Sequence, residues 1–312
     1  MKDLVKGMTW REAEWLFNSS GQFSHIYSTP LESGYIFEND DERKYAILSM
    51  ALAAEATKVI ILAYALMTNH FHFIVKGDNG KEFFMNFRDR MSKYLSRHGR
   101  PGLLDDMVPG EKIITSLGQF YNELASVIRN PYVVSTEVNM FSYQWCSGFL
   151  YFNDLAEKIP FVSPDKLSYR ELRKITKSRD TVLPSWIRIS EGCVNPVCFV
   201  DYKLVERLFR NPQEYLSSCL KNVEAQVQVA ISMNEKPVLT DDEMYRMIRN
   251  RMDKEYRATD YKLLSAAQRT EVLKYMKYEL AASNGQIARV LHLRQADVDA
   301  IFPQTAKNRL AQ

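Results

Sequence analysis

The sequence predicts an α+β protein, in which a small antiparallel sheet covered on one face by helices is followed by an all-helical C-terminal region. Up to about residue 130, short β-rich runs alternate with helical patterns, whereas almost every pattern beyond residue 200 is helical. No glycine-rich phosphate loop follows the expected strands, which argues against a parallel nucleotide-binding sheet. The chain has 312 residues, of which 46% are hydrophobic, and this length suits about two globular domains.

Composition and charge exclude several classes of protein. A membrane span needs roughly 18 consecutive apolar residues, and the sequence contains no such run. The first residues lack the apolar region of a signal peptide, so we expect a cytosolic protein without a membrane partner. The net charge of +3 does not by itself require binding to nucleic acid. Because the cysteines form no CxxC pair, we expect four reduced structural thiols, at Cys146, Cys193, Cys198 and Cys219.

The chain is expected to begin with a helix, a strand and a second helix. The segment Thr9-Trp10-Arg11-Glu12 is a capping box, which opens a short helix within residues 1–20. Residues 23–29 alternate and are rich in β-branched and aromatic side chains, and Pro30 ends this strand. Residues 40–58 carry an apolar stripe behind an acidic first turn, which is typical of a helix.

A hairpin and two more helices are expected next. The β-rich runs 59–67 and 70–76 flank the polar pair Thr68-Asn69, which suits a tight connection. A helix over 81–98 ends at glycine and proline, and residues 113–130 resume helical periodicity until Pro131. The predicted order is therefore strand, helix, strand, strand, helix, helix.

The rest of the chain predicts a connector over 156–200 and a helical domain over 201–312. Three short helices are expected at about 266–280, 284–292 and 295–302. Their tight joints suit a helix-turn-helix within 266–302, in which Gln295 would contact DNA. A purely structural three-helix cap is the alternative interpretation.

The triplet His70-Phe71-His72 carries the most chemical information. Alternate side chains of a strand share a face, so both imidazoles should point the same way while Phe71 points into the opposite layer. Two imidazoles on one face can bind one cation. The alternative is that they are two unrelated polar positions.

A third ligand is available at the end of the helix expected over 113–130. The carbonyl oxygen of the Asn130 side chain suits a hard divalent ion such as Mg²⁺ or Mn²⁺. Ser126 lies one helical turn earlier, and residues four apart share a helix face. Position 126 should therefore point into the same site as Asn130.

The run Ala63–Val75, AYALMTNHFHFIV, resembles the signature of the HUH single-strand DNA transposases, most closely of the REP-associated tyrosine transposases. The family's usual proline at position 68 is Thr68 here. The resemblance covers about residues 21–155, which we take as the transposase-like domain. Further segments that agree are His25-Ile26-Tyr27, Ile36-Phe37, Tyr94–Gly102 (YLSRHGRPG), Ile128–Pro131 (IRNP) and Phe141–Trp145 (FSYQW).

This resemblance implies a ferredoxin-like sheet domain, the HUH palm, that binds single-stranded or hairpin DNA with Mg²⁺ or Mn²⁺. It implies His70, His72 and Asn130 as the metal ligands. In the family a tyrosine one turn before the amide ligand attacks a DNA phosphate and leaves a 5′-phosphotyrosine. Members are often dimers, so the resemblance also points to a homodimer.

The nucleophile position is Ser126, which departs from the family. A serine hydroxyl is shorter than a phenol and has a pKa far above the phenol value of about 10, so serine is a poor substitute. Tyr121 falls on the opposite side of the helix and is expected in the core, which leaves Tyr132 and Tyr94 as stand-ins. A natural loss of cleavage or an engineered Tyr→Ser change would equally account for the serine.

Several basic residues follow the hairpin and could guide a DNA backbone, since phosphate contacts supply most of the sequence-independent affinity. An ordinary solvated helix face explains them equally well. The residues are Arg88, Arg90, Lys93, Arg97 and Arg100.

Three hypotheses for function follow from the sequence. The first is a metal-dependent enzyme that nicks DNA and transfers strands. The second is a DNA-binding descendant that keeps the fold and the metal ligands without a nucleophile. The third is a helical DNA-binding regulator in which His70 and His72 are incidental.

Overall fold

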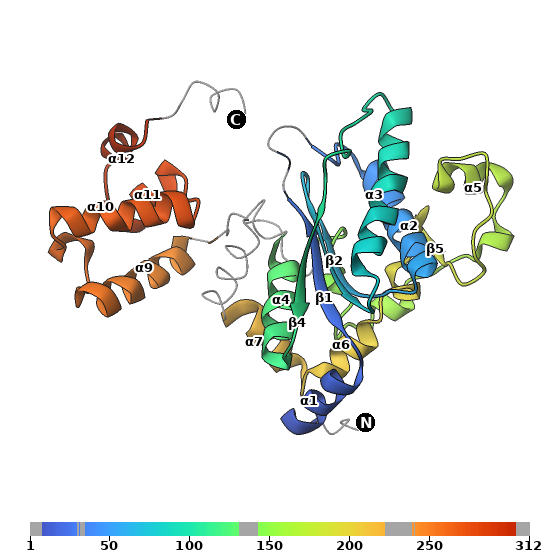
Figure 1. Cartoon of the computed structure of the whole chain (residues 1–312), viewed down its shortest axis with the longest axis horizontal. Coiled ribbons are helices and arrows are strands. Elements are labelled where there is room, and N and C mark those ends of the chain that lie inside the picture. Colours follow the sequence, from blue (N-terminus) through green and yellow to red (C-terminus); the bar gives the residue numbers. More distant parts are fainter. Residues whose placement is uncertain are drawn as a thin grey trace. The chain divides into compact units, whose positions relative to one another are not determined.

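The computed structural model describes residues 8–29, 31, 35–130, 143–221, 239 and 241–303. The chain divides into two compact units, Met1–Lys221 and Asn222–Gln312 (Figure 1). Each unit has its own hydrophobic core. The predicted fold class, an α+β domain followed by an all-helical region, is confirmed.

A four-stranded sheet forms the centre of the first unit. Its strands lie in the order β2-β3-β1-β4, and every neighbouring pair is antiparallel. This strand order, with one helix after β1 and one after β3, is the expected ferredoxin-like arrangement. The elements are β1 (Phe23–Ser28), α2 (Asp40–Thr57), β2 (Ile60–Leu66), β3 (Phe71–Lys76), α3 (Gly80–Arg97), β4 (Pro109–Ile114) and α4 (Leu117–Arg129).

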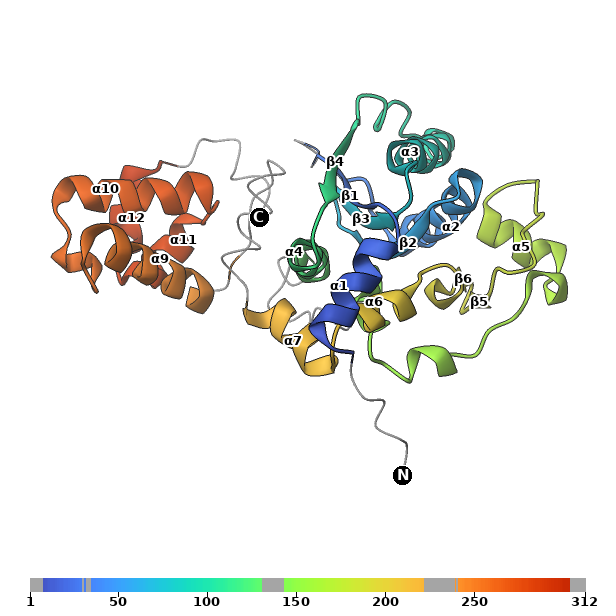
Figure 2. The same cartoon turned by 60° about the horizontal axis from the view of Figure 1, so that its bottom comes forward.

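Helices α2 and α3 lie on one face of the sheet and α4 on the other (Figure 2), so helices cover both faces and not the single face expected from the sequence. The alternation of β3 explains the division, because Phe71 and Phe73 both pack against Phe87 of α3. On the opposite face, His25 of β1 contacts Glu123 of α4. Along β3, the phenylalanine side chains and the His72 side chain therefore point to opposite faces of the sheet.

The prediction of a single helix over residues 113–130 is wrong at its N-terminal end. Residues up to Ile114 form the edge strand β4, which pairs with β1 from Ser28↔Pro109 to Phe23↔Ile114. Helix α4 begins at Leu117, because the side chain of Ser116 accepts a hydrogen bond from the backbone of Gln119 and caps the helix. The expected order of elements therefore lacked one strand.

The first unit extends further along the chain than the expected boundary at residue 200. Helices α6 (Tyr202–Leu208) and α7 (Pro212–Lys221) pack against α1 (Trp10–Ser19) and α4 respectively. Tyr121 of α4 donates a hydrogen bond to the carbonyl of Leu208 and stacks on Phe209 with ring centroids 4.3 Å apart. Because α6 and α7 pack on α1 and α4, the first unit ends at Lys221 and not at the expected residue 200.

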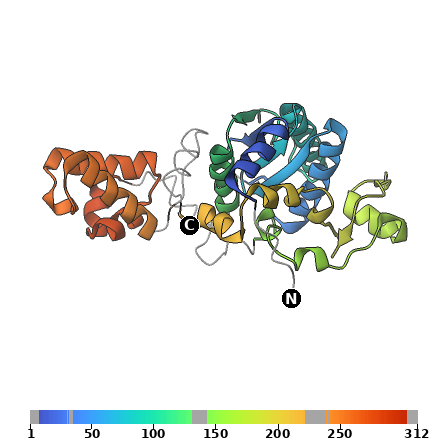
Figure 3. The same cartoon turned by 90° about the horizontal axis from the view of Figure 1, so that it is seen from below.

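The expected connector over 156–200 is also folded onto the first unit. It contains α5 (Tyr169–Thr176) and the short strands β5 (Ile189–Ser190) and β6 (Cys193–Val194), beside α2 (Figure 3). Short 3-10 helices lie at Ser147–Phe149, Ala156–Lys158, Pro164–Lys166 and Pro196–Cys198. The capping box that opens α1 is present as predicted.

The second unit is helical throughout its described part, as expected. It comprises α9 (Asp241–Tyr256), a 3-10 turn at Tyr261–Leu263, α10 (Ala266–Lys274), a π-helical turn at Tyr275–Glu279, α11 (Asn284–Leu291) and α12 (Gln295–Ile301). The three short helices expected between 266 and 302 thus occur. Whether they bind DNA stays a prediction.

Two expectations from composition can be compared with the structure. All four cysteines are free thiols, as expected. None of the described helices is long and apolar enough to cross a membrane.

Replacing Phe120 with alanine should lower the free energy of unfolding of the first unit by about 3–5 kcal/mol. The ring is fully buried in α4 and contacts Phe17 and Phe23. Urea titration followed by tryptophan fluorescence measures this unit alone, because all four tryptophans lie in it. Val182→Ala, at a side chain 87% exposed, is the control and should cost less than about 0.5 kcal/mol. Equal effects would contradict the docking of α4.

Candidate metal centre

Four buried or half-buried side chains from four elements form a row of one ion pair and two hydrogen bonds. The Nζ of Lys112 on β4 lies 2.6 Å from Oε1 of Glu123 on α4. Oε2 of Glu123 lies 2.8 Å from Nδ1 of His25 on β1. Nε2 of His25 lies 3.1 Å from Nδ1 of His72 on β3. In this row, which we call the relay, Glu123, His25 and His72 are fully buried, whereas Lys112 is half-buried at the edge strand.

His70 lies beside the end of the relay, immediately before β3. Its Nδ1 is 2.8 Å from Oδ1 of Asn69. The rings of His70 and His72 have centroids 5.0 Å apart and lie at 85° to each other. The two imidazoles predicted to share a face are thus adjacent.

Burial controls the charge of these groups. It lowers the pKa of His70 to about 4. Burial, with further contributions from His70 and His25, also holds the pKa of His72 well below its usual value. Burial alone would raise the pKa of the Glu123 carboxyl, but its contacts with His25 and Lys112 outweigh burial and lower it. At neutral pH the site therefore combines an ionised carboxylate with two neutral imidazoles, which is the form that binds metals.

Helix α4 runs along β1 in the direction of the two histidines. Phe120 contacts Phe23 with ring centroids 5.7 Å apart, and one turn later Glu123 contacts His25. Tyr27 is the next residue of β1 on this face, and it pairs with His72. The following turns of α4 carry Ser126 and Asn130 on the same helix face as Glu123.

Of the two residues at the end of α4 that are predicted for the site, Ser126 is buried and Asn130 is half-buried. Ser126 is 9% exposed. Asn130 ends the helix, and its side-chain nitrogen is buried without a hydrogen-bond partner in the described part of the chain.

No group of three or more His, Cys, Asp or Glu side chains has metal-binding geometry within residues 8–29, 31, 35–130, 143–221, 239 and 241–303. A metal centre at His70 and His72 therefore requires Asn130 or another oxygen donor. This requirement agrees with the ligand set predicted from the sequence, which stays a prediction.

The tyrosines considered as substitutes for position 126 lie elsewhere. Tyr121 is in the core, where burial raises the pKa of its phenol well above the ordinary value. Tyr94 is buried among the helices of the opposite sheet face, stacked on Tyr45 with ring centroids 4.4 Å apart. Tyr132 lies outside the described residues. Tyr27, by contrast, has its ring centroid 6.3 Å from that of His72.

Tyr27 has its ring over a glycine of the neighbouring strand. Gly110 of β4 is its cross-strand partner, and a Cβ atom at that position would overlap the ring. The glycine thus makes room for the aromatic side chain between β4 and the histidines.

Two of the basic residues predicted to contact DNA, Arg88 and Arg90, form contacts within the protein. Arg88 pairs with Asp89 and donates to the carbonyl of Met107, and Arg90 donates to Asn86. In contrast, Lys93 and Arg97 are exposed. These two are the better candidates for phosphate contacts, which stay a prediction.

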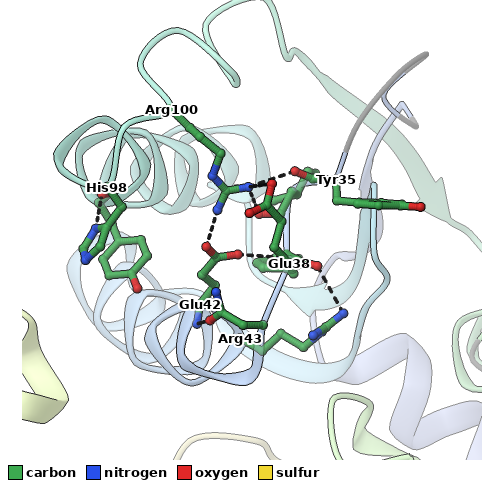
Figure 4. Close-up of polar contacts among 10 residues, drawn as sticks. Tyr35, Glu38, Glu42, Arg43, His98 and Arg100 are labelled. Atoms are coloured by element: carbon green, nitrogen blue, oxygen red, sulfur yellow. Dashed lines mark hydrogen bonds and ion pairs between the residues drawn. The ribbon is translucent and has the colours of Figure 1, made fainter.

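Arg100 closes a loop onto the first turn of α2 (Figure 4). Its guanidinium donates to the carbonyl of Tyr35 at 3.0 Å and pairs with Glu42 and Glu38. Glu42 is 4% exposed and also accepts a hydrogen bond from the backbone of Glu38. These contacts give Arg100 a structural role, and its contact with DNA stays a prediction.

The candidate DNA helix of the second unit carries negative charge. On α12, Gln295 donates to Asp299 at 3.2 Å, and Arg294 pairs with Asp297 at 2.9 Å. Two aspartates on a seven-residue helix do not favour contact with phosphates. Contact of Gln295 with DNA therefore stays a prediction without electrostatic support.

Sequence reasoning missed Lys112 and Glu123, and it quoted His25 only as part of the segment His25-Ile26-Tyr27 without a role in the site. One signal was present. Glu123 is the one acidic residue of α4 and lies on its buried side, three residues before Ser126 and seven before Asn130. A lone carboxylate on a buried helix face requires a partner, and that requirement points to this site.

Comparison with known proteins gives one remote similarity. A solved structure of a REP-associated tyrosine transposase bound to a REP hairpin is similar at 11% sequence identity and a TM-score of 0.35, over 45% of this chain and 82% of that one. No family model matches the chain, and no curated protein matches it significantly.

Glu123→Gln should lower the free energy of unfolding at pH 7 by roughly 1.5–3 kcal/mol, the range for hydrogen bonds to charged groups. Because the pKa of Glu123 is lowered in the folded chain, its carboxylate stabilises the fold above the unfolded pKa of about 4.3. This contribution is lost as the pH falls through the folded value. Urea titrations from pH 7 to about pH 3 should therefore show the two proteins converging.

Glu14→Gln, at an exposed position of α1, is the matched control and should leave stability unchanged at each pH. A stability difference for Glu123→Gln that stays constant with pH would contradict the role of the ionised carboxylate.

Proposed function

We propose that the first unit binds single-stranded or hairpin DNA through a divalent cation held by His70, His72 and Asn130. The observation that carries this proposal is the adjacent pair of neutral imidazoles on the sheet face that α4 covers. The sequence resemblance to the REP-associated transposases supplies DNA as the ligand. The direction of α4 supports Asn130 as the third ligand.

The donor set fits a cation such as Mn²⁺ or Mg²⁺. Rings 5.0 Å apart and nearly perpendicular can direct one nitrogen each toward a common point. Imidazole suits Mn²⁺ better than the harder Mg²⁺, so we expect tighter binding of Mn²⁺. A bound ion would polarise a phosphoryl oxygen and orient the DNA backbone.

The chain's own residues favour DNA binding without cleavage. Ser126 occupies the position of the family's tyrosine, and its hydroxyl is too short and too basic as an alkoxide to replace a phenolate. Lys93 and Arg97 are exposed and would contact phosphates away from the metal. The proposed protein thus orients a DNA backbone and does not form a phosphotyrosine through α4.

An active strand-transfer enzyme is the second candidate. Tyr27 supports it, because this tyrosine lies on the histidine face and its ring stacks toward His72. In that case the phenol would come from β1 rather than from α4.

Both His70→Ala and His72→Ala should weaken Mn²⁺ binding by at least about 10- to 100-fold, the loss already seen for residues that only support a ligand. Isothermal titration of the full chain measures the affinity. His98→Ala is the matched control, because His98 is exposed and donates to the carbonyl of Tyr94 on the opposite sheet face. Unchanged binding in both site variants would contradict the metal centre and favour the helical regulator.

The unchanged protein should form no covalent adduct with a labelled hairpin carrying a single-stranded extension in the presence of Mn²⁺, whereas Ser126→Tyr should form one. A denaturing gel separates the adduct from free DNA. Ser126→Phe controls for the size of the ring. An adduct that is lost in Tyr27→Phe would establish the second candidate, and a failure of Ser126→Tyr would contradict the placement of position 126 in the site.

A further inference from the structure

We propose that a pocket beside strand β2, separate from the candidate metal centre, binds a nucleotide of single-stranded DNA. The base would stack on aromatic rings of the pocket, and its phosphate would pair with Arg188. The pocket has a volume of about 590 Å³, which is typical of sites for small molecules. The choice of DNA as the occupant rests on the proposed function, whereas the stacking chemistry rests on the residues of the pocket.

The pocket lies where the segment that follows β6 runs along the outer edge of β2. Val200 and Asp201 line it. Val200 pairs in parallel with Ile61 of β2, and the backbone of Asp201 donates to the carbonyl of Ile61 at 2.9 Å. His72 pairs with Ala65, four residues further along β2. Ile61 and Ala65 are thus roughly 13 Å apart along the strand, so the pocket lies in the same unit but outside the candidate metal centre.

Three aromatic side chains line the pocket, namely Phe161, Trp186 and Tyr202. The ring of Phe161 is 46% exposed, and Trp186 is half-buried. The indole nitrogen of Trp186 donates to Oε1 of Glu55 on α2 at 2.9 Å, which holds the indole in one orientation. An oriented indole and an exposed phenyl ring are side chains on which unpaired bases stack.

Arg188 supplies the positive charge of the pocket. It is exposed, and its guanidinium carbon lies 4.5 Å from the centroid of the Phe161 ring, a cation–π contact. Lys203 also lines the pocket, but it pairs with Glu157 at 3.1 Å. Within the described part of the chain no carboxylate pairs with Arg188 in this way. Its planar guanidinium is therefore available for a phosphate, which it can bind with two hydrogen bonds.

This combination of groups favours a nucleotide over other ligands of similar size. A cationic ligand would be repelled by Arg188, and a purely apolar ligand would remove the guanidinium from water without compensation. The carboxylate of Asp201 accepts a hydrogen bond from the backbone of Leu204 at 3.0 Å and caps α6, so the helix N-terminus offsets its charge. Ser163 and Ser185 supply hydroxyl groups that can bind any base edge.

Fluorescence anisotropy of the full chain with a labelled oligothymidine, with Mn²⁺ and in EDTA, tests the pocket. Phe161→Ala should weaken binding about 5- to 150-fold, the loss typical of a stacked base. Arg188→Gln should weaken binding and also reduce its salt dependence, because a phosphate contact is lost. Tyr169→Ala and Arg170→Gln, at exposed positions of α5 outside the pocket, are the matched controls and should bind as the unchanged protein does.

This experiment separates the two proposals. Unchanged affinity in both Phe161→Ala and Arg188→Gln would overturn the pocket, whether or not Mn²⁺ strengthens binding. If the proposed metal centre is wrong, Mn²⁺ adds nothing to the affinity, but the loss in Phe161→Ala persists in EDTA because stacking requires no metal.

Two further probes distinguish stacking from charge and a strand from a free nucleotide. An abasic oligomer of equal length should bind the unchanged protein more weakly than oligothymidine does and should not respond to Phe161→Ala. Equal binding of the two oligomers would overturn the stacking. Free thymidine monophosphate should compete only at a much higher concentration than the strand, and competition at the same concentration would overturn DNA as the occupant.

Ultraviolet cross-linking locates the contact in the unchanged protein. An oligonucleotide that carries iododeoxyuridine is irradiated with the full chain, and mass spectrometry identifies the cross-linked peptides. We expect cross-links to peptides that contain Phe161 or Trp186. Cross-links confined to other parts of the chain would overturn the proposal.

Discussion

One buried carboxylate constrains the arrangement of the first unit. Glu123 lies between α4 and the sheet, where an ionised group is stable only if positive or donor groups surround it. Lys112 supplies the charge from the edge strand and His25 supplies the donor from a central strand. These contacts fix where α4 lies along β1. The positions of Ser126 and Asn130 relative to the two histidines follow from that register.

On the opposite face of the sheet, packing between aromatic side chains and not charge holds α3 in place. Phe71 and Phe73 alternate with His72 along β3, and their rings contact the aromatic side chains of α3. Successive side chains of β3 therefore point alternately into an apolar layer on one face and a polar layer on the other. This separation lets a row of polar groups be buried without interrupting the core.

Periodicity predicted most elements of the fold, because amphipathic patterns and caps are local. The strand β4 escaped prediction, since Pro109 and Gly110 are poor β-formers and the strand exists through its pairing with β1. The terminal Ile113 and Ile114 also fit the helical pattern that follows. The extent of the first unit was missed because α7 packs on α4 across a long stretch of sequence.

The ligand positions were predictable from spacing, whereas the groups that support them were not. His70 and His72 are separated by one residue and share a face, so a strand pattern is sufficient to pair them. His25 and Glu123 are 98 residues apart, and only the folded chain brings them together. A similar limit applies to Arg100, which looks like a surface cation in the sequence but binds carbonyl and carboxylate groups in the structure.

Gly110 determines how closely the edge strand β4 can approach the polar layer. The terminal strand β4 has no side chain at this point, and the phenol of Tyr27 fills the space. A methyl group at position 110 would overlap the Tyr27 ring and displace it relative to His25 and His72. The place of the Tyr27 ring beside the two imidazoles thus depends on a residue that contributes no chemistry, because a side chain at position 110 would occupy the space of the ring.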